Sequence, residues 1–480
     1  MKRSSGILLH IVSLPGKYGI GSLGKNAFEF VDFLEESGQK LWQICPLSPT
    51  GYGNSPYSSY SAFAGNPLLI DLEEFIHNDV VIPEFSGEKV DYDKVINFKY
   101  TVLRKAYTTF IQTKEYTEFI ESQNFWLDDF ALFMALKNHF NLSAWNTWES
   151  SVKLREENAL LLYTESLKDE INFQKYLQFI FFQQWIALRA YANSKSVQIV
   201  GDMPIYVAAD SADAWSNPEL FALDENMNPK FVAGVPPDGF SITGQLWGNP
   251  VYDWNYCEHT GFDWWKKRFS SAFEIYDILR IDHFIGFENY WAVPFGDKTA
   301  ENGSWQKAKG RKIFEKLSKE NHNLPIIAED LGLLTGDVVK LRDDFGFPGM
   351  KVLQFAFYDG QEADFLPHNY TENCVVYTGT HDNEIKKSWY KNLPEKPKKF
   401  LHKYLKFDGN NVSSKLITAA WESIADIAVA PMQDFLNLGN EARFNSPGTT
   451  EGNWQWRVKK EQLTNRLASG IKSRTMKANR

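Results

Sequence analysis

The segment Ile278-Leu-Arg-Ile-Asp282 decides how this sequence folds. It is a short apolar, β-branched run that ends in a carboxylate. Three other segments repeat this pattern: Val197-Gln-Ile-Val-Gly-Asp202, Pro325-Ile-Ile-Ala-Glu329-Asp330 and Val375-Val-Tyr-Thr-Gly-Thr-His381-Asp382. Such runs are typical of parallel strands that are buried on both faces. Side chains just past the strand ends form the active-site rim of a β/α barrel, so the four acids are predicted to meet there.

The order of the elements predicts the fold class. Strand-like runs occur at residues 6–14, 40–47, 197–207, 278–283, 325–329, 350–355, 374–380 and 427–432. Helical patterns lie between most of them, for example at 26–37, 309–319 and 337–344. This alternation predicts an α/β protein, a (β/α)8 or TIM barrel that forms a single catalytic domain over residues 1–480.

Two large insertions are expected between the barrel strands. Residues 72–196 contain several amphipathic patterns rich in Phe, Leu, Trp and Lys, so this insertion is predicted to be mainly helical. Residues 208–277 interleave turn residues with Trp, Phe and Gln. That composition predicts a loop-rich insertion that presents aromatic side chains over the active-site cleft.

Composition and charge restrict the partners of the chain. With 43% hydrophobic and 23% charged residues, it has the composition of an ordinary globular enzyme. The net charge of −9 argues against nucleic acid and against an anionic membrane surface as partners. The three cysteines form no CxxC, and no run of about 18 apolar residues occurs. We therefore expect a cytoplasmic protein, a monomer or a homodimer.

The candidate acids occupy unlike settings. Arg280 and Asp282 point to the same side of their strand, and a neighbouring guanidinium keeps a carboxylate ionised and nucleophilic. Glu329 ends an apolar run, where burial raises the pKa of a carboxyl group toward neutrality. Asp382 follows His381 and is a third acid that can bind sugar hydroxyls and stabilise positive charge. A nucleophile and a proton donor in unlike environments suit glycosidic-bond chemistry.

Each residue also has a simpler interpretation. An acid after a strand is commonly the N-cap of the next helix, and Arg280 with Asp282 could be only a structural ion pair. His381 could only satisfy hydrogen bonds. A metal cluster of Asp and His is a further alternative, but no HxxxH or similar spacing supports it, and no metal is expected. Only the joint pattern of four acids at four strand ends favours a catalytic centre.

Longer motifs extend this pattern along the chain. They are Pro49-Thr-Gly-Tyr-Gly-Asn-Ser-Pro-Tyr57, Gly244-Gln-Leu-Trp-Gly-Asn-Pro250, Leu279-Arg-Ile-Asp-His-Phe284, Ala328-Glu-Asp-Leu-Gly332, Thr380-His-Asp-Asn383, Arg443-Phe-Asn-Ser-Pro-Gly448 and Asn453-Trp-Gln-Trp-Arg457. With these motifs, nearly the whole chain resembles glycoside hydrolase family 77, the 4-α-glucanotransferases (amylomaltases or disproportionating enzymes). The short acid-containing motifs also fit the wider α-amylase clan. The loops around Tyr57 and Trp247 are more specific to family 77.

The resemblance implies a reaction and a set of site residues. It implies a retaining transfer of an α-1,4-glucan segment to the 4-hydroxyl of an acceptor glucose or glucan, through a covalent glucosyl-aspartate. Maltooligosaccharides and α-1,4-glucans would serve as donor and acceptor, with no cofactor and no metal. The resemblance implies Asp282 as nucleophile, Glu329 as general acid/base and Asp382 as transition-state stabiliser. It implies substrate-binding roles for Tyr57, Asp202, Trp247, Arg280, His381 and Asn453.

Other functions stay open at this point. A hydrolytic α-amylase or α-glucosidase would use the same carboxylates. Whether the glycosyl group passes to water or to a sugar depends on a difference in free energy that the amino-acid sequence does not show. A non-catalytic glucan-binding protein would not need acids in unlike environments, so the intact set of three argues against it. A metal-dependent aldolase-type barrel is a weaker third alternative.

Overall fold

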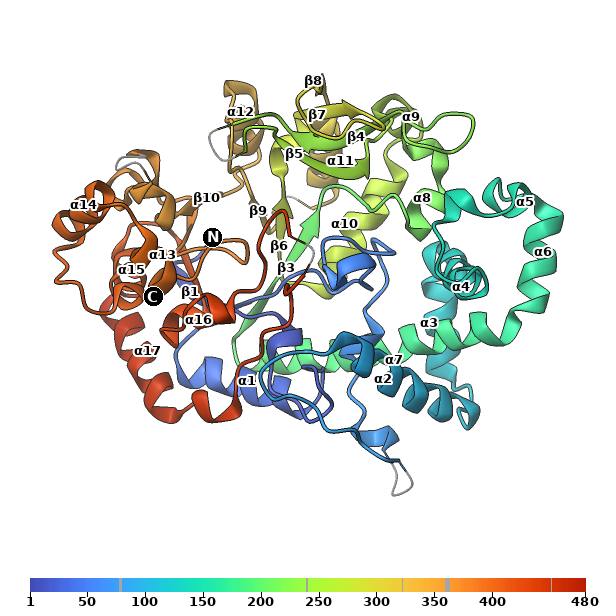
Figure 1. Ribbon diagram of the computed structural model, residues 1–480, viewed down its shortest axis with the longest axis horizontal. Coiled ribbons are helices and arrows are strands. Elements are labelled where there is room, and N and C mark those ends of the chain that lie inside the picture. The colour runs from blue at the N-terminus through green and yellow to red at the C-terminus, as the bar shows by residue number, and fades with distance from the viewer. Residues whose placement is uncertain (77–79, 239–240, 322, 359–362, 450) are drawn as a thin grey trace.

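A closed barrel of parallel strands lies at the centre of this computed structural model, which describes residues 1–76, 80–238, 241–321, 323–358, 363–449 and 451–480 (Figure 1). Within these ranges the strand order is β1-β12-β11-β10-β9-β6-β3-β2. The strands are β1 (Ser4–Leu8), β2 (Leu41–Gln43), β3 (Gln198–Pro204), β6 (Ile278–Asp282), β9 (Ile326–Ala328), β10 (Gly349–Val352), β11 (Cys374–Tyr377) and β12 (Ile427–Pro431). Each predicted run overlaps one of them, which confirms the barrel.

Helices cover the outside of the barrel. The amphipathic α1 (Lys25–Glu36) buries Ala27, Phe30, Val31 and Leu34, which are spaced to lie on one face of the helix. It packs against α7 (Lys168–Ser194) and α17 (Asn465–Lys477). The helices between and after the later barrel strands are α10 (Asp263–Ile275), α11 (Gly310–Glu320), α12 (Gly336–Asp344), α13 (Lys386–Asn392), α14 (Glu395–Leu405), α15 (Val412–Glu422), α16 (Met432–Phe435) and α17 (Asn465–Lys477). The helices predicted at 26–37, 309–319 and 337–344 correspond to α1 (Lys25–Glu36), α11 and α12. Among the described residues, none of the helices combines the length and apolar character that a membrane span requires.

Between β2 and β3 the chain forms mainly helices, which lie on the right of Figure 1. They are α2 (Tyr92–Thr108), α3 (Lys114–Ser122), α4 (Asn124–His139), α5 (Ser150–Lys153), α6 (Glu157–Ser166) and α7 (Lys168–Ser194). The long α7 packs against α4 and also against β3, so it joins the helical group to the barrel. Residues 77–79 of this predicted insertion lie outside the described ranges.

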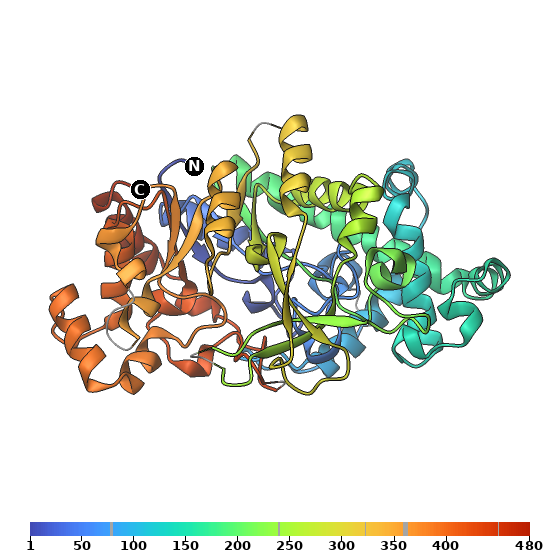
Figure 2. The same ribbon diagram turned by 90° about the horizontal axis from the view of Figure 1, so that it is seen from above.

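The second insertion contains more regular structure than the predicted loops. Residues 208–277 form α8 (Ala212–Ser216), β4 (Phe231–Val235), β5 (Gln245–Pro250), α9 (Trp254–His259) and α10, with 239–240 outside the described ranges. Strands β4 and β5 join β7 (Asn289–Pro294) and β8 (Ser304–Lys307) in a four-stranded antiparallel sheet of order β5-β4-β7-β8. This sheet lies at the top of Figure 1, and Figure 2 shows its strands crossing the molecule as seen from above.

Candidate active site

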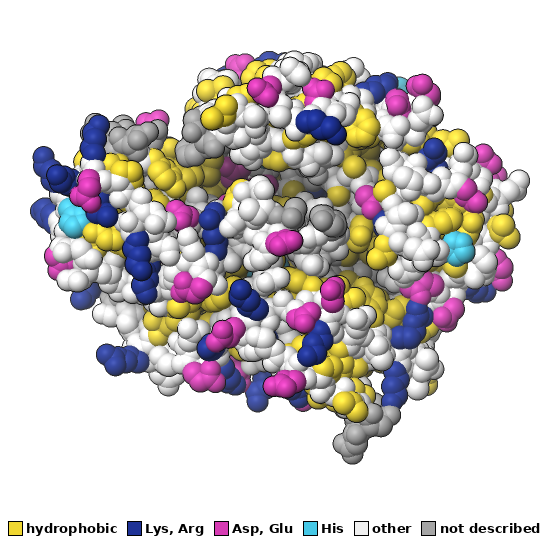
Figure 3. Space-filling model, in the orientation of Figure 1, with side chains coloured by type: hydrophobic (Ala, Val, Ile, Leu, Met, Phe, Trp, Pro, Cys, Tyr) yellow, Lys and Arg dark blue, Asp and Glu magenta, His cyan; other side chains and the backbone are white. Residues whose placement is uncertain are grey.

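The four predicted acids come from four barrel strands. Asp202 lies on β3, Asp282 ends β6, Glu329 directly follows β9 and Asp382 lies in the loop after β11. Because all barrel strands run parallel, the last three residues stand at the same rim. Figure 3 shows the molecular surface hollowed near the centre of this view, below the antiparallel sheet.

The N-cap interpretation of these acids does not hold. The turn after β6 begins after His283, α12 has Thr335 as its N-cap, and α13 has Ile385. The acids instead contact other residues of the cluster: Asp202 and Asp282 bind Arg280, Glu329 binds the N–H of His283, and Asp382 lies against His381. A chemical role for the cluster is therefore the stronger interpretation.

Arg280 binds two of the acids. It is the register partner of Asp202 on the adjacent strand, and its Nη1 lies 2.6 and 2.7 Å from the two carboxylate oxygens of Asp202. The same nitrogen lies 3.0 Å from Oδ1 of Asp282. Burial raises the pKa of Asp202, and the guanidinium opposes that shift. One buried cation thus holds two carboxylates beside each other, as charge-assisted hydrogen bonds allow.

A chain of contacts continues from Asp202 to Asp382. Tyr57 donates its hydroxyl to Oδ2 of Asp202 at 2.7 Å, and this hydroxyl lies 3.3 Å from Nδ1 of His381. The rings of Tyr57 and His381 stack, with centroids 4.7 Å apart and planes 18° from parallel. Nε2 of His381 lies 3.2 Å from Oδ2 of Asp382. Burial opposes protonation of His381, but the adjacent Asp382 outweighs it and raises the pKa of the imidazole.

Asp382 is also held by two residues that the sequence prediction did not select. Asn445 donates from Nδ2 to Oδ1 of Asp382 at 2.6 Å, and Arg443 donates to its main-chain oxygen. Burial acts to raise the pKa of Asp382, but His381 and Asn445 outweigh it and lower the pKa to about 2. The carboxylate is therefore ionised at neutral pH. Both partners belong to the motif Arg443-Phe-Asn-Ser-Pro-Gly448, which was the signal available in the sequence.

Asn453 makes its contacts within its own loop. Its Oδ1 accepts the main-chain N–H of Ser446 at 2.9 Å, and its Nδ2 donates to the carbonyl of Thr449 at 2.9 Å. The next residue, Trp454, reaches the predicted site instead, with its ring centroid 5.8 Å from that of His381. Trp454 therefore lies close to the stacked rings of Tyr57 and His381, whereas the side chain of Asn453 stabilises its own loop through hydrogen bonds to the main chain.

Glu329 is held by main-chain groups. Its Oε2 accepts the N–H of His283 at 2.7 Å, and its Oε1 accepts the N–H of Leu331 at 3.1 Å. Burial is the largest influence and raises the pKa of Glu329 to about 8, against the lowering effect of Arg280. The expected direction of this shift is confirmed. A carboxyl group that keeps its proton at neutral pH is suited to act as a general acid.

Asp282 and Glu329 occupy adjacent strand ends. The register pairs Ile281 of β6 with Ala328 of β9, so the next residues on the two strands are the two acids. The main-chain N–H of Glu329 donates to the carbonyl of Ile281 at 3.0 Å. An Arg-bound carboxylate and a buried, protonated one thus stand side by side at the rim.

Trp247 flanks the end of β6 from the antiparallel sheet. Its ring centroid lies 4.8 Å from that of His283, at right angles to it, and 6.3 Å from that of Tyr206. The side chain of Trp247 is 37% exposed. Trp247 thus presents a partly exposed aromatic ring against His283, the residue that follows the predicted nucleophile.

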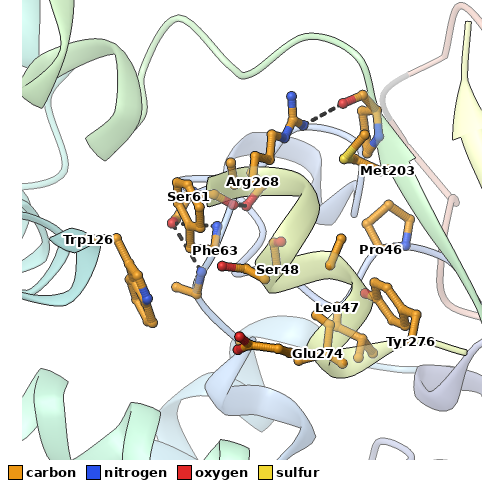
Figure 4. Close-up of a pocket in the computed structure, with 18 of the residues that line it drawn as sticks. Pro46, Leu47, Ser48, Ser61, Phe63, Trp126, Met203, Arg268, Glu274 and Tyr276 are labelled. Carbon is orange, nitrogen blue, oxygen red and sulfur yellow. Dashed lines mark hydrogen bonds between the residues drawn. The ribbon is translucent and has the colours of Figure 1, made fainter. Parts of the chain in front are cut away.

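A cavity of about 250 Å³, shown in Figure 4, has Tyr57 and Asp202 among its lining residues. Its other walls include Phe63, Trp126 and Tyr276, from the loop after β2, α4 and the segment before β6. Asp282, Glu329 and Asp382 do not line this cavity. Of the four predicted acids, Asp202 alone lines this cavity, so the cavity adjoins the acid cluster at Asp202.

Comparisons with known proteins identify the family of the chain. The model of glycoside hydrolase family 77, described as 4-alpha-glucanotransferase, matches residues 9–464. A 4-alpha-glucanotransferase of Clostridium butyricum is 48% identical over 476 residues, covering 96% of this chain and 98% of the relative. One from Synechocystis is 49% identical over 487 residues, covering 98% of this chain and 96% of the relative. The solved structure of an amylomaltase from Streptococcus agalactiae in complex with acarbose superposes with a TM-score of 0.96 at 43% identity, over 100% of both chains. The chain therefore belongs to glycoside hydrolase family 77, the 4-alpha-glucanotransferases, and is an enzyme of the transferase class.

Proposed function

We propose that the enzyme moves a segment of an α-1,4-glucan to the 4-hydroxyl of an acceptor glucose or glucan by a retaining double displacement. The observation that carries this proposal is the pair of unlike acids at adjacent strand ends, Asp282 beside Arg280 and Glu329 with its pKa raised to about 8. The similar amylomaltase structure contains acarbose, which supports a carbohydrate ligand.

In the first half-reaction Glu329 gives its proton to the glycosidic oxygen while Asp282 attacks the anomeric carbon. The bond from that carbon to the glycosidic oxygen breaks, and the leaving chain departs with a new 4-hydroxyl. A β-linked glucosyl-aspartate forms, and Glu329 is left as a carboxylate. The second half-reaction reverses these roles, because Glu329 takes the proton of an acceptor 4-hydroxyl as it attacks the same carbon. Two inversions give overall retention.

The remaining charges of the cluster suit the transition state of both steps. The anomeric carbon becomes positively charged as the bond breaks, and we assign the stabilisation of that charge to the ionised carboxylate of Asp382. His381, with its raised pKa, donates to Asp382 and holds its orientation. Tyr57 contacts both His381 and Asp202, and Asp202 binds Arg280. These contacts hold the side chains of the cluster in position before substrate binds.

Transfer in place of hydrolysis requires that a sugar reach the intermediate before water does. A thousandfold preference corresponds to about 4 kcal/mol of differential transition-state binding. We assign this selection to the insertion 208–277, which carries the exposed ring of Trp247 against His283, the residue after Asp282. A sugar bound on that ring would be oriented for attack and would exclude water.

Incubation of the pure enzyme with maltotriose tests the proposal. The expected products are glucose and a ladder of chains longer than maltotriose. A hydrolase would give only shorter products, and a binding protein would retain maltotriose unchanged. Either of those outcomes would contradict the proposed transfer.

A further inference from the structure

His283 lies between two of the predicted site residues and contacts both. It follows β6 with a left-handed backbone (φ +53°), which is uncommon for a residue that carries a side chain. Its main-chain N–H donates to Oε2 of Glu329 at 2.7 Å. Its ring packs at right angles to Trp247, at 4.8 Å between centroids. One residue therefore joins the predicted acid/base to the aromatic wall.

The surroundings of His283 fix its ring. Gly286 donates its N–H to the His283 carbonyl at 2.9 Å. A Cβ at Gly286 would lie 3.1 Å from Cδ2 of His283 and 2.9 Å from Cδ1 of Ile205, so glycine leaves the space that the ring needs. Burial lowers the pKa of His283 to about 4, so the ring packs against Trp247 as a neutral aromatic group at working pH.

We propose that His283 is a positioning residue that sets how the glycosyl-enzyme divides between an acceptor sugar and water. Its ring holds Trp247 in place for the acceptor, while its main chain holds the carboxyl group that must take the acceptor's proton. Anchoring both to one residue fixes the distance between the acceptor surface and the base. This inference rests on the proposed function of Trp247 and Glu329, and His283 itself forms no bond with the sugar.

Two substitutions separate the ring from the main chain. His283→Asn keeps the N–H and a residue type that tolerates a left-handed backbone, but removes the aromatic ring. His283→Phe keeps an aromatic ring, and Phe262 already adopts φ +61° in this chain. His139→Asn is a matched control, because the ring of His139 also packs edge-on against an aromatic residue, Phe140, at 4.9 Å in the helical insertion.

The measurement is the ratio of transfer to hydrolysis over a series of maltotriose concentrations, with transfer read from chains longer than maltotriose and hydrolysis from the gain in reducing ends. This ratio does not depend on the fraction of enzyme that is folded. His283→Asn is expected to lower it about three- to tenfold, the effect of losing one aromatic pair contact. It should also raise the maltotriose concentration that gives half-maximal transfer. His283→Phe should restore most of the ratio, and His139→Asn should match the unsubstituted enzyme.

Three results would overturn the inference. The first is an unchanged ratio in His283→Asn, and the second is a ratio in His283→Phe as low as in His283→Asn. The third comes from the double variant with Trp247→Ala: if His283 acts through Trp247, the added His283→Asn lowers the ratio no further, and an additive loss contradicts this. Failure of the proposed function itself looks different, because the unsubstituted enzyme would then form no longer chains.

Discussion

Arg280 holds Asp202 across the junction of β6 and β3, with Nη1 2.6 and 2.7 Å from the two oxygens of that carboxylate. The same nitrogen reaches Asp282, and the contacts run on from Asp202 through Tyr57 and His381 to Asp382. Glu329 is bound separately, by main-chain N–H groups. Burial raises the pKa of Glu329 against the lowering effects of Arg280 and the His283 N–H, whereas His381 and Asn445 lower the pKa of Asp382 against its burial.

Activity on natural glucans is expected to fall as pH rises through about 8. Burial raises the pKa of Glu329 to about 8, and only its protonated form can act as the acid of the first step. The pH profile of kcat/KM for maltotriose measures this limb. A glycosyl fluoride donor needs little protonation of its leaving group, so the limb should be absent there. The same limb with both donors would assign it to another group.

The raised pKa of Glu329 also determines how the stability of the protein changes with pH. The folded-state pKa of Glu329 lies above its ordinary value of 4.5, so the folded protein binds more protons than the unfolded chain between about 4.5 and 8. The contribution of Glu329 to the free energy of unfolding is therefore full below that window and is lost as pH rises through it. Denaturant titrations of the Glu329→Gln variant and the unsubstituted enzyme, at several pH values, should converge at low pH.

Glu329→Gln is expected to lower turnover of maltotriose about 10²- to 10⁴-fold, because it removes general acid and base assistance. Formation of the glycosyl-enzyme from a glycosyl fluoride should be retained far better. Glu315→Gln, at an exposed position on α11, is the control and should match the unsubstituted enzyme. Unimpaired turnover of maltotriose by Glu329→Gln would remove Glu329 from the mechanism.

The barrel and its rim could be predicted because their signals are local. A strand buried on both faces must be an apolar run, and an acid directly after it must stand at the rim. The antiparallel sheet lacked such a signal. Its strands come from two different connections, as in the pairing of Phe231 with Pro294, and glycines such as Gly234 and Gly248 interrupt them.

The contacts that the segment 443–457 makes with the acids also could not be predicted from the sequence. Asn445 lies 63 residues after Asp382, and no strand or helix period relates the two. Its motif was visible, but the choice between Asn445 and Asn453 depends on which side chain faces the acids. Only the folded loop decides that, because it turns Asn453 onto its own backbone and Trp454 toward His381.

Asn445→Ala is expected to lower activity about 10- to 100-fold, since it removes a hydrogen bond of about 1.5–3 kcal/mol to a charged group. Asn445→Asp should lose more at neutral pH, because a second carboxylate repels Asp382 and raises the pKa of the pair. The ratio of Asn445→Asp to Asn445→Ala activity should rise as pH falls. Asn453→Ala is the comparison, and an Asn445→Ala variant that is more active than Asn453→Ala would contradict this assignment.

Gly379→Ala is expected to destabilise the protein by about 1–3 kcal/mol, the usual cost of overpacking. A Cβ at this position would lie 2.2 Å from Nζ of Lys386. Lys386 is buried and is held by Gln354 and the Glu384 carbonyl, so it cannot move away freely. Activity should fall as well, because Gly379 lies in the same loop as Asp382.

Gly470→Ala provides the control for that substitution. Gly470 lies inside α17 with open space around it, so alanine should stabilise the helix by about 0.5–1 kcal/mol. Thermal unfolding of both variants checks the pair. A Gly379→Ala variant as stable as the unsubstituted protein would contradict the prediction, because it would show that the Lys386 side chain moves aside with little loss of stability.

The proposed covalent bond between Asp282 and the sugar is tested most directly by the mass of the Glu329→Gln variant after incubation with α-maltotriosyl fluoride and no acceptor, followed by peptide mapping. The variant should accumulate one glycosyl group on the peptide that contains Ile278–Asp282, and Asp282→Asn in the same background should abolish it. A protein that releases fluoride without gaining mass, or that carries the sugar on another residue, would contradict the mechanism.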